Sequence, residues 1–287
     1  MNKSRFILGS AQLGLNYGIN NVVGKPTPDE ALELLREARL KGIRVLDTAE
    51  GYGTAQEIIG VFQHANGKPF LVNTKFSVSD ESLSNQAKEA LETLNTEFIN
   101  VYFYHRFHDF VQYPEIKMEL IKLKGEGVIK YCGISVYDND QLKIAAEDKT
   151  IDVIQVPFNL LDNFTQKGAL LIKAKEMGKV IQARSVFLQG LFFKNEETYP
   201  IKLEPLKKYV RMLKSIALES SLDMASLALA YVFSRPEIDE VVIGIDNTEQ
   251  LNLNLNQSEI KLESEIVKII ESIMVHPVNL LYPTNWS

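Results

Sequence analysis

The sequence predicts an α/β protein, a (β/α)8 TIM barrel that forms a single domain over residues 1–287. Short β-rich runs alternate with longer stretches whose apolar residues recur at helical spacing, which is typical of a parallel sheet covered by helices. Eight such units favour a closed barrel, a fold that commonly needs about 250 residues. An open, doubly wound sheet is the structural alternative.

Eight runs are expected to form the strands of this barrel. Several of them are continuous apolar stretches, as expected when helices cover one face of a strand and the barrel core fills the other. The runs span residues 6–9, 44–48, 70–75, 100–105, 131–135, 152–156, 179–183 and 240–244.

Capping signals support the helices between the strands. In residues 28–41, Pro28 suits the first helical turn, and Thr27 before it suits the cap position. Gly42 follows as the expected end of that helix. Residues 82–95 show the same helical spacing of apolar residues.

The last third of the chain contains additions to the repeating units. Residues 190–203 are expected to form an irregular loop, and residues 258–273 an extra amphipathic helix followed by a tail. Residues 251–256 alternate leucine with asparagine like a strand, but Leu251 and Leu255 share a helical face. We therefore expect a helix there, which closes the eighth unit.

Composition excludes several functional classes. The net charge of −6 argues against nucleic-acid binding, which needs a basic face to neutralise phosphates. The single cysteine, Cys132, excludes an internal disulfide and favours a reducing compartment. No apolar run reaches the roughly 20 residues that span a bilayer. We expect a cytoplasmic protein without a membrane partner, either a monomer or a small homo-oligomer.

Four residues predict the chemistry: Asp47, Tyr52, Lys75 and His105 lie at or just after strand ends. Active sites of β/α barrels lie at the C-terminal ends of the strands. An ammonium near a tyrosine lowers the pKa of its phenol, so Lys75 would prepare Tyr52 as a proton donor, with Asp47 holding Lys75. His105 would orient a carbonyl oxygen, and a cofactor would supply the hydride.

Each of these residues also has an ordinary structural interpretation. A lone tyrosine more often packs, an Asp–Lys pair is often structural, and a strand histidine more often lies satisfied in the core; the joint placement favours function. His105, His108 and Asp109 are a possible metal set, but a further ligand at suitable spacing is missing, and we expect no metal. The G-x-G-x-x-G fingerprint and the P-loop pattern are absent.

Residues 42–53, with Glu57 and Gly60 after them, resemble the signature of the aldo-keto reductase superfamily. The resemblance implies a (β/α)8 barrel that uses NADPH, less often NADH, without a Rossmann fold. It also implies that the family's catalytic tetrad is Asp47, Tyr52, Lys75 and His105. The first 26 residues look like bacterial members associated with carbohydrate metabolism.

The resemblance also implies cofactor contacts, with departures at three places. Val136 stands where the family usually has asparagine, and Arg184 where an aromatic residue commonly stacks on the nicotinamide. Between Gly244 and Asn254 there is no lysine or arginine to bind a 2′-phosphate. We expect NADP(H), with NAD(H) as the alternative. The implied contacts are Ser10, Ala11, Asp47, Ser135, Gln155, Arg184, Ser185, Val186, Leu188, Gly190, Gly244, Gln250 and Asn254. Lys194 or Lys202 is the candidate partner of the 2′-phosphate, whereas Asp246 and Glu249 oppose it.

These observations predict an NAD(P)-dependent reductase of an aldehyde, ketone or sugar carbonyl. Its pocket is expected to include Gln12, Tyr17, Arg106, Phe158 and Trp286. One alternative is a cofactor-binding regulatory subunit with slow turnover. Another is an isomerase or lyase that retains its cofactor.

Overall fold

The structure, a computed structural model, describes residues 2–21 and 23–286. Its strands form a closed parallel barrel in chain order, in which β8 pairs with β1 and completes the ring. This closure confirms the predicted barrel over the open sheet. The strands are β1 Phe6–Gly9, β2 Val45–Asp47, β3 Leu71–Phe76, β4 Ile99–Tyr104, β5 Ile129–Ser135, β6 Val153–Pro157, β7 Val180–Arg184 and β8 Glu240–Gly244.

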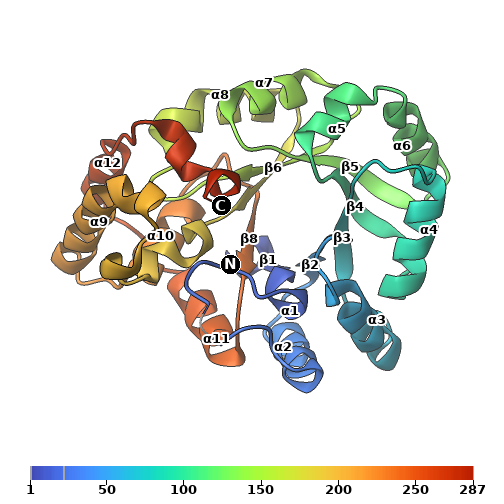
Figure 1. The fold of residues 1–287 in the computed structure, drawn as a ribbon, viewed down its shortest axis with the longest axis horizontal. Coiled ribbons are helices and arrows are strands. Elements are labelled where there is room, and N and C mark those ends of the chain that lie inside the picture. The colour runs from blue at the N-terminus through green and yellow to red at the C-terminus, as the bar shows by residue number, and fades with distance from the viewer. Residues whose placement is uncertain (1, 22, 287) are drawn as a thin grey trace.

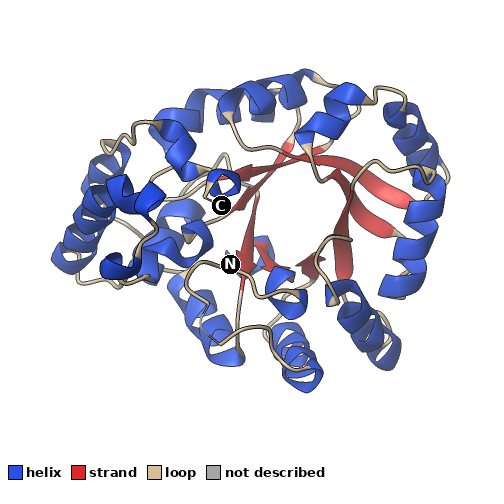
Figure 2. Ribbon diagram, viewed as in Figure 1, coloured by secondary structure: helices blue, strands red, loops and turns tan. Residues whose placement is uncertain are grey.

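Helices surround the strands on the outside (Figures 1 and 2). The α-helices are α1 Ala11–Gly14, α2 Pro28–Leu40, α3 Ala55–Asn66, α4 Leu83–Leu94, α5 Phe107–Gln112, α6 Ile116–Gly125, α7 Asn139–Glu147, α8 Phe164–Glu176, α9 Lys207–Glu219, α10 Met224–Phe233, α11 Thr248–Gln257 and α12 Ser264–Glu271. Short 3₁₀ turns are η1 Asn2–Arg5, η2 Leu188–Phe193, η3 Glu196–Thr198, η4 Ile201–Leu206, η5 Val278–Leu281 and η6 Pro283–Asn285.

The capping of α2 follows the sequence closely. The Thr27 side chain accepts a hydrogen bond from the Glu30 amide at 3.4 Å, and the Glu30 carboxylate accepts one from the Thr27 amide at 2.8 Å. This reciprocal capping box satisfies two donors that a helix start leaves free. Gly42 follows with a φ of +94°, a left-handed conformation that suits glycine after a helix end.

Two expectations near the end of the chain need correction. Residues 258–273 were expected to be one helix, but α12 covers only Ser264–Glu271, because Glu263 before it has an extended backbone. Residues 190–203 hold 3₁₀ turns rather than an irregular loop, since Pro200 and Pro205 interrupt continuous helix there. The ambiguous leucine–asparagine segment lies inside α11, as predicted.

The barrel interior positions the residues above it. A Cβ on Gly133 of β5 would lie 2.8 Å from Val101 and would overlap the Phe103 ring, so only glycine leaves room for that ring. Phe103 is fully buried, and the Lys75 ammonium lies 5.7 Å from its ring centroid. The aromatic ring therefore supports Lys75 inside the barrel.

Within the described residues, no single helix is long and apolar enough to cross a membrane. Residues Ile201–Glu219 and Met224–Phe233 meet the length and composition criteria only as a pair bent by 90°.

Candidate active site

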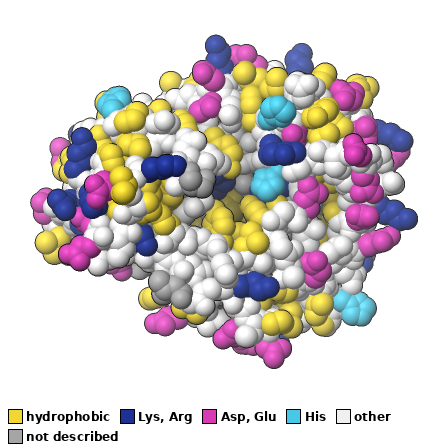
Figure 3. Space-filling view, in the orientation of Figure 1, with side chains coloured by type: hydrophobic (Ala, Val, Ile, Leu, Met, Phe, Trp, Pro, Cys, Tyr) yellow, Lys and Arg dark blue, Asp and Glu magenta, His cyan; other side chains and the backbone are white. Residues whose placement is uncertain are grey.

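A cavity of about 690 Å³ opens at the C-terminal ends of the strands. Figure 3 shows this face hollowed at its centre, with hydrophobic, basic and histidine side chains gathered around the hollow. Its volume lies in the range of small-molecule sites, about 300–1,000 Å³. Residues at or just after the strand ends share its lining: Gly9, Ser10, Asp47, Lys75, His105, Ser135, Gln155, Arg184 and Gly244.

The four residues of the predicted tetrad meet at one end of this cavity, which we call the tetrad end. The Lys75 ammonium forms an ion pair with the Asp47 carboxylate and donates to the Thr48 carbonyl at 2.9 Å. It lies 5.2 Å from the centroid of the Tyr52 ring. The Tyr52 and His105 rings meet edge to face, with centroids 5.8 Å apart. The structure therefore brings together all four residues.

A buried chain of amide and carboxyl groups lies behind Asp47. Gln155 donates from one amide nitrogen to Asp47 at 2.9 Å and to the Gln182 side chain at 3.2 Å. Gln182 in turn donates to the Glu240 carboxylate at 2.8 Å. These bonds fix the Asp47 carboxylate, and they occupy both amide hydrogens of Gln155.

Burial governs the protonation of the tetrad. It raises the pKa of the Tyr52 phenol above its ordinary value, and the Asp47 charge raises it further, while Arg184 opposes the rise. The expected lowering of this pKa by Lys75 does not dominate, because burial and the charge of Asp47 both raise it. Burial also lowers the pKa of Lys75. It lowers the pKa of His105 to about 4, with the charge of Lys75 adding to the effect.

It follows that Tyr52 and His105 are both neutral at neutral pH. A neutral phenol still carries the proton that a proton donor must deliver. A neutral imidazole has one N–H group that can donate a hydrogen bond.

A close backbone contact positions Tyr52. A Cβ on Gly14 would lie 2.7 Å from the Ala55 nitrogen and would overlap the Tyr52 carbonyl oxygen. Gly53, with a φ of +55°, turns the chain directly after Tyr52. Helix α1 therefore abuts the tyrosine loop, and both glycines are needed for this approach.

Arg184 is an unusual cation in the cavity wall. Its guanidinium lies 4.4 Å from the centroid of the Tyr137 ring and donates to the Val136 carbonyl at 3.0 Å and to the Ser185 hydroxyl at 3.2 Å. Its Nε is buried without a hydrogen-bond partner. The cation thus stacks on a tyrosine and keeps one buried donor without a partner.

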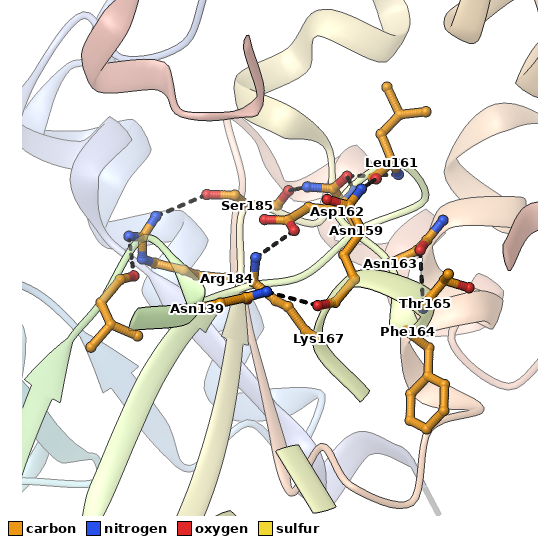
Figure 4. Close-up of polar contacts among 12 residues, drawn as sticks. Asn139, Asn159, Leu161, Asp162, Asn163, Phe164, Thr165, Lys167, Arg184 and Ser185 are labelled. Carbon is orange, nitrogen blue, oxygen red and sulfur yellow. Dashed lines mark hydrogen bonds and ion pairs between the residues drawn. The ribbon is translucent and has the colours of Figure 1, made fainter. Parts of the chain in front are cut away.

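The loop after β7 has a strained backbone and is held in place by hydrogen bonds from neighbouring residues. Ser185, Leu188 and Gln189 all have φ values between +48° and +58°, which side chains other than glycine rarely adopt. Asn159 donates to the Ser185 carbonyl at 3.2 Å (Figure 4). The side-chain Oδ1 of Asn159 accepts from the Asp162 backbone amide at 3.0 Å, and Asp162 forms a buried ion pair with Lys167. This network fixes the loop that borders the cavity.

The segment after β1 is tied to the same loop. Gln189 donates from its side chain to the Tyr17 hydroxyl at 3.1 Å, and its carbonyl accepts from the Ile19 amide at 3.0 Å. Lys194 donates to the Ile19 carbonyl at 3.1 Å. The two segments therefore form one side of the cavity together.

The opposite end of the cavity, which we call the far end, lies where α10 packs against α11. In Figure 1, α11 lies in the helix ring between α10 and α2. The far end is lined by Asp223, Met224, Ala225, Gly244, Asp246, Gln250, Leu253, Asn254 and Gln257.

Most of the predicted cofactor and pocket residues line the cavity, but four do not. Leu188 and Phe158 are fully buried in the core, where Phe158 stacks on Tyr231 with centroids 5.7 Å apart. Arg106 is paired with Asp109 instead. Trp286 donates to the Leu280 carbonyl at 2.9 Å and packs, partly buried, against the core. The predicted residues that line the cavity are Ser10, Ala11, Gln12, Tyr17, Asp47, Ser135, Gln155, Arg184, Ser185, Val186, Gly190, Gly244, Gln250 and Asn254.

Sequence reasoning missed Asp223, Gln257, Tyr137 and Gln189, all of which line the cavity. Asp223 has a sequence signal, since it is the N-cap of α10 and accepts from the Ser226 amide at 2.6 Å, but a cap does not reveal a cavity. Tyr137 lies two residues after the end of β5, so the sequence already placed it beside the predicted cofactor residue Ser135.

The possible metal set does not form a three-residue group, although His108 Nδ1 lies 3.6 Å from the Asp109 carboxylate. The Asp109 carboxylate accepts from the Val78 amide at 3.0 Å and from Arg106, while the His108 side chain is 76% exposed. Across residues 2–21 and 23–286, no three His, Cys, Asp or Glu side chains are grouped to hold a metal.

Residues 5–275 match the Aldo/keto reductase family, and the chain belongs to that family. It is 25% identical to an L-galactose dehydrogenase of Arabidopsis thaliana over 291 residues, which cover 93% of this chain and 91% of that protein. It is 23% identical to an NADH-specific methylglyoxal reductase of Escherichia coli over 288 residues, which cover 84% and 88%.

Among solved structures, the holo form of an aldo-keto reductase from Bacillus halodurans shares the fold, with a TM-score of 0.76 at 20% identity. That match covers 94% of this chain and 92% of the other. Family membership makes this chain an NAD(P)-dependent oxidoreductase that acts on small-molecule carbonyl substrates.

Proposed function

We propose that the tetrad end reduces the carbonyl of a small aldehyde, ketone or sugar, with Tyr52 as the proton donor. The observation that carries this proposal is the buried Lys75–Asp47 ion pair beside the Tyr52 ring, at the mouth of the barrel. A nicotinamide cofactor supplies the hydride when it is bound.

Each tetrad residue has a separate task in this proposal. Tyr52 gives its phenolic proton to the carbonyl oxygen as the alcohol forms. The Lys75 ammonium stabilises the phenolate that remains, and Asp47 holds Lys75 in place. The neutral His105 donates a hydrogen bond that orients the carbonyl oxygen. Proton transfer by a positioned side chain typically accelerates a reaction by about 10²- to 10⁴-fold.

The cavity suits a nicotinamide dinucleotide. Ser135 and Gln155 would hold the carboxamide; because Asp47 and Gln182 take both amide hydrogens of Gln155, its side-chain carbonyl oxygen is the group that faces the ligand. Arg184 adds a buried Nε that lacks a partner. The loop of Ser185, Val186 and Gly190 would cover the middle of the dinucleotide. Gly244, Gln250 and Asn254 would hold the adenosine end.

Both nicotinamide cofactors satisfy this proposal. The family resemblance favours NADP(H), with NAD(H) as the alternative. They differ by one phosphate on the adenosine ribose, so the choice depends on the charges at the far end.

A sugar is the favoured carbonyl substrate. Gln12 and Tyr17 line the cavity and offer amide and hydroxyl groups to a polyhydroxylated molecule. The relative from Arabidopsis thaliana is named for a sugar. We further propose that residues 1–287 act as one domain in the cytoplasm, where the buried Cys132 remains a thiol.

The proposal is tested with purified protein, NADH or NADPH carrying deuterium at the transferable C4 position, and a panel of aldoses and small aldehydes. Loss of reduced-cofactor absorbance with one deuterium in each alcohol product supports reduction. An isomerase or lyase would convert substrate without net cofactor oxidation. A regulatory subunit would bind the cofactor tightly and turn over slowly.

A further inference from the structure

The far end of the cavity has a charge opposite to that of the tetrad end. Among the lining residues, the side chains that carry or can gain a positive charge are Lys75, His105 and Arg184. Lys75 lies one residue before the end of β3, His105 directly follows β4, and Arg184 ends β7. The far end instead contributes two carboxylates, Asp223 and Asp246, together with amide side chains.

The position of the adenosine follows from the position of the chemistry. The nicotinamide must lie at the tetrad end, because its hydride has to reach the carbonyl that Tyr52 protonates. The cavity continues from there to α10 and α11, so the adenosine ribose lies near the far end. This step rests on the proposed function.

A 2′-phosphate would meet no cation at the far end. Such a group carries about −1.5 to −2 charges at neutral pH and is normally bound by arginine or lysine. Lys194, a candidate partner from the sequence, donates to the Ile19 carbonyl and does not line the cavity. Lys202, the other candidate, lies in η4 and also does not line it.

The carboxylates of Asp223 and Asp246 differ in how many of their acceptor positions are already hydrogen-bonded. Asp223 caps α10 and accepts from the Gln257 amide at 3.0 Å, so much of its accepting capacity is occupied. Among residues 2–21 and 23–286, Gln250 is the residue that holds Asp246: the Asp246 backbone amide donates to Oε1 of Gln250 at 3.0 Å, and Oδ2 of Asp246 accepts from the Gln250 side-chain amide at 3.2 Å. This reciprocal pair fixes the Asp246 carboxylate and leaves its Oδ1 for another donor.

We propose that the far end selects NAD(H) over NADP(H), with Asp246, oriented by Gln250, as the residue that determines this specificity. Its carboxylate accepts from the ribose 2′-hydroxyl of NAD(H) and repels the 2′-phosphate of NADP(H). Because Asp246 is exposed, added salt screens this repulsion.

The test measures dissociation constants of NADH and NADPH for the full chain by the change in fluorescence on binding, without any substrate. We expect NADH to bind at least about tenfold more tightly than NADPH at low salt, as like charges at a partly exposed site would give. Asp246→Asn should lose most of this preference, mainly by binding NADPH more tightly. The preference should also shrink at high salt.

Glu249→Gln is the matched control. Glu249 lies three residues further along, is exposed like Asp246, and does not line the cavity, so its neutralisation should leave the preference unchanged. Equal or tighter binding of NADPH by the unaltered chain would overturn the inference and leave the proposed reduction standing. An unchanged preference in Asp246→Asn would overturn the assignment to Asp246. Failure to bind either cofactor would overturn both proposals.

Discussion

The two ends of the cavity hold their charges in different ways. At the tetrad end, Lys75 and Asp47 are nearly fully buried, form an ion pair and rest on a buried hydrogen-bond chain. At the far end, Asp246 is exposed and held by one neighbouring glutamine. Charges in a dry environment interact strongly, whereas exposed charges are screened. Changes at the tetrad end should therefore affect turnover or stability, and changes at the far end should alter only cofactor choice.

The largest effect is expected from Tyr52→Phe. It removes the proton donor and leaves the ring contacts, so kcat/KM should fall by about 10²- to 10⁴-fold while reduced-cofactor binding is retained. Steady-state kinetics and cofactor titration measure the two quantities. Tyr104→Phe is the control, because the Tyr104 hydroxyl is buried without a partner and does not line the cavity. Undiminished reduction by Tyr52→Phe would refute the mechanism.

The next effect is expected from Lys75→Met, which leaves the buried Asp47 carboxylate without its cation. Removing one partner of a buried ion pair typically costs about 3–5 kcal/mol, and we expect urea denaturation to show a loss in that range. Turnover should also be lost. The ratio of NADH to NADPH affinity should stay as it is, because the far end is unchanged.

Lys167→Met is the matched comparison for this variant. Lys167 and Asp162 form a second buried ion pair, with side chains 1% and 0% exposed, that does not line the cavity. We expect a similar loss of stability. Because this pair also holds the loop that borders the cavity, cofactor affinity should weaken, but kcat at saturating cofactor should fall much less than in Lys75→Met. If both variants lose turnover equally, the Lys75–Asp47 pair serves structure rather than chemistry.

A smaller effect is expected from Gly14→Ala. The new methyl group would meet the Tyr52 carbonyl and Ala55, so the tyrosine loop must move, at a typical overpacking cost of about 1–3 kcal/mol. Thermal unfolding and kcat together report this shift. Gly125→Ala is the control, because its Cβ meets nothing within 4 Å. A Gly14→Ala variant with unaltered kcat would show that Tyr52 tolerates displacement.

The barrel, and the meeting of Asp47, Tyr52, Lys75 and His105 at one face of it, could be predicted from sequence because both depend on local signals. Strand runs, caps and the residues at strand ends lie within short segments, and a parallel barrel brings all strand ends to one face. Phe158 and Trp286, which do not line the cavity, show the limit of this reasoning. Each is an aromatic residue near the end of an element, and only tertiary packing decides that Phe158 stacks on Tyr231 and that Trp286 packs against the core.

The far end shows a second limit of the sequence. Asp223 is a helix cap and Gln257 a helix end, and they meet only because α10 packs against α11. The direction of the Tyr52 pKa was also missed. Sequence shows the nearby lysine, but burial and the paired Asp47 set the outcome.

The effect that is smallest near neutral pH is expected from acidification, through His105. The pKa of His105 is about 4 in the native protein, and the ordinary value is 6.5. Between pH 6.5 and 4, His105 is therefore protonated in the unfolded chain but mostly neutral in the native protein. The contribution of His105 to the free energy of unfolding is therefore complete above about pH 6.5 and falls as the pH decreases toward 4, by at most about 1.4 kcal/mol per pH unit.

Urea unfolding at several pH values measures this effect, and the free energy of unfolding should depend less steeply on pH in His105→Asn than in the unaltered chain. His108→Asn, which changes an exposed side chain outside the cavity, should not. Equal slopes in all three proteins would mean that His105 ionises as a solvated histidine does, and the contrast between a dry tetrad end and a solvated far end would fail.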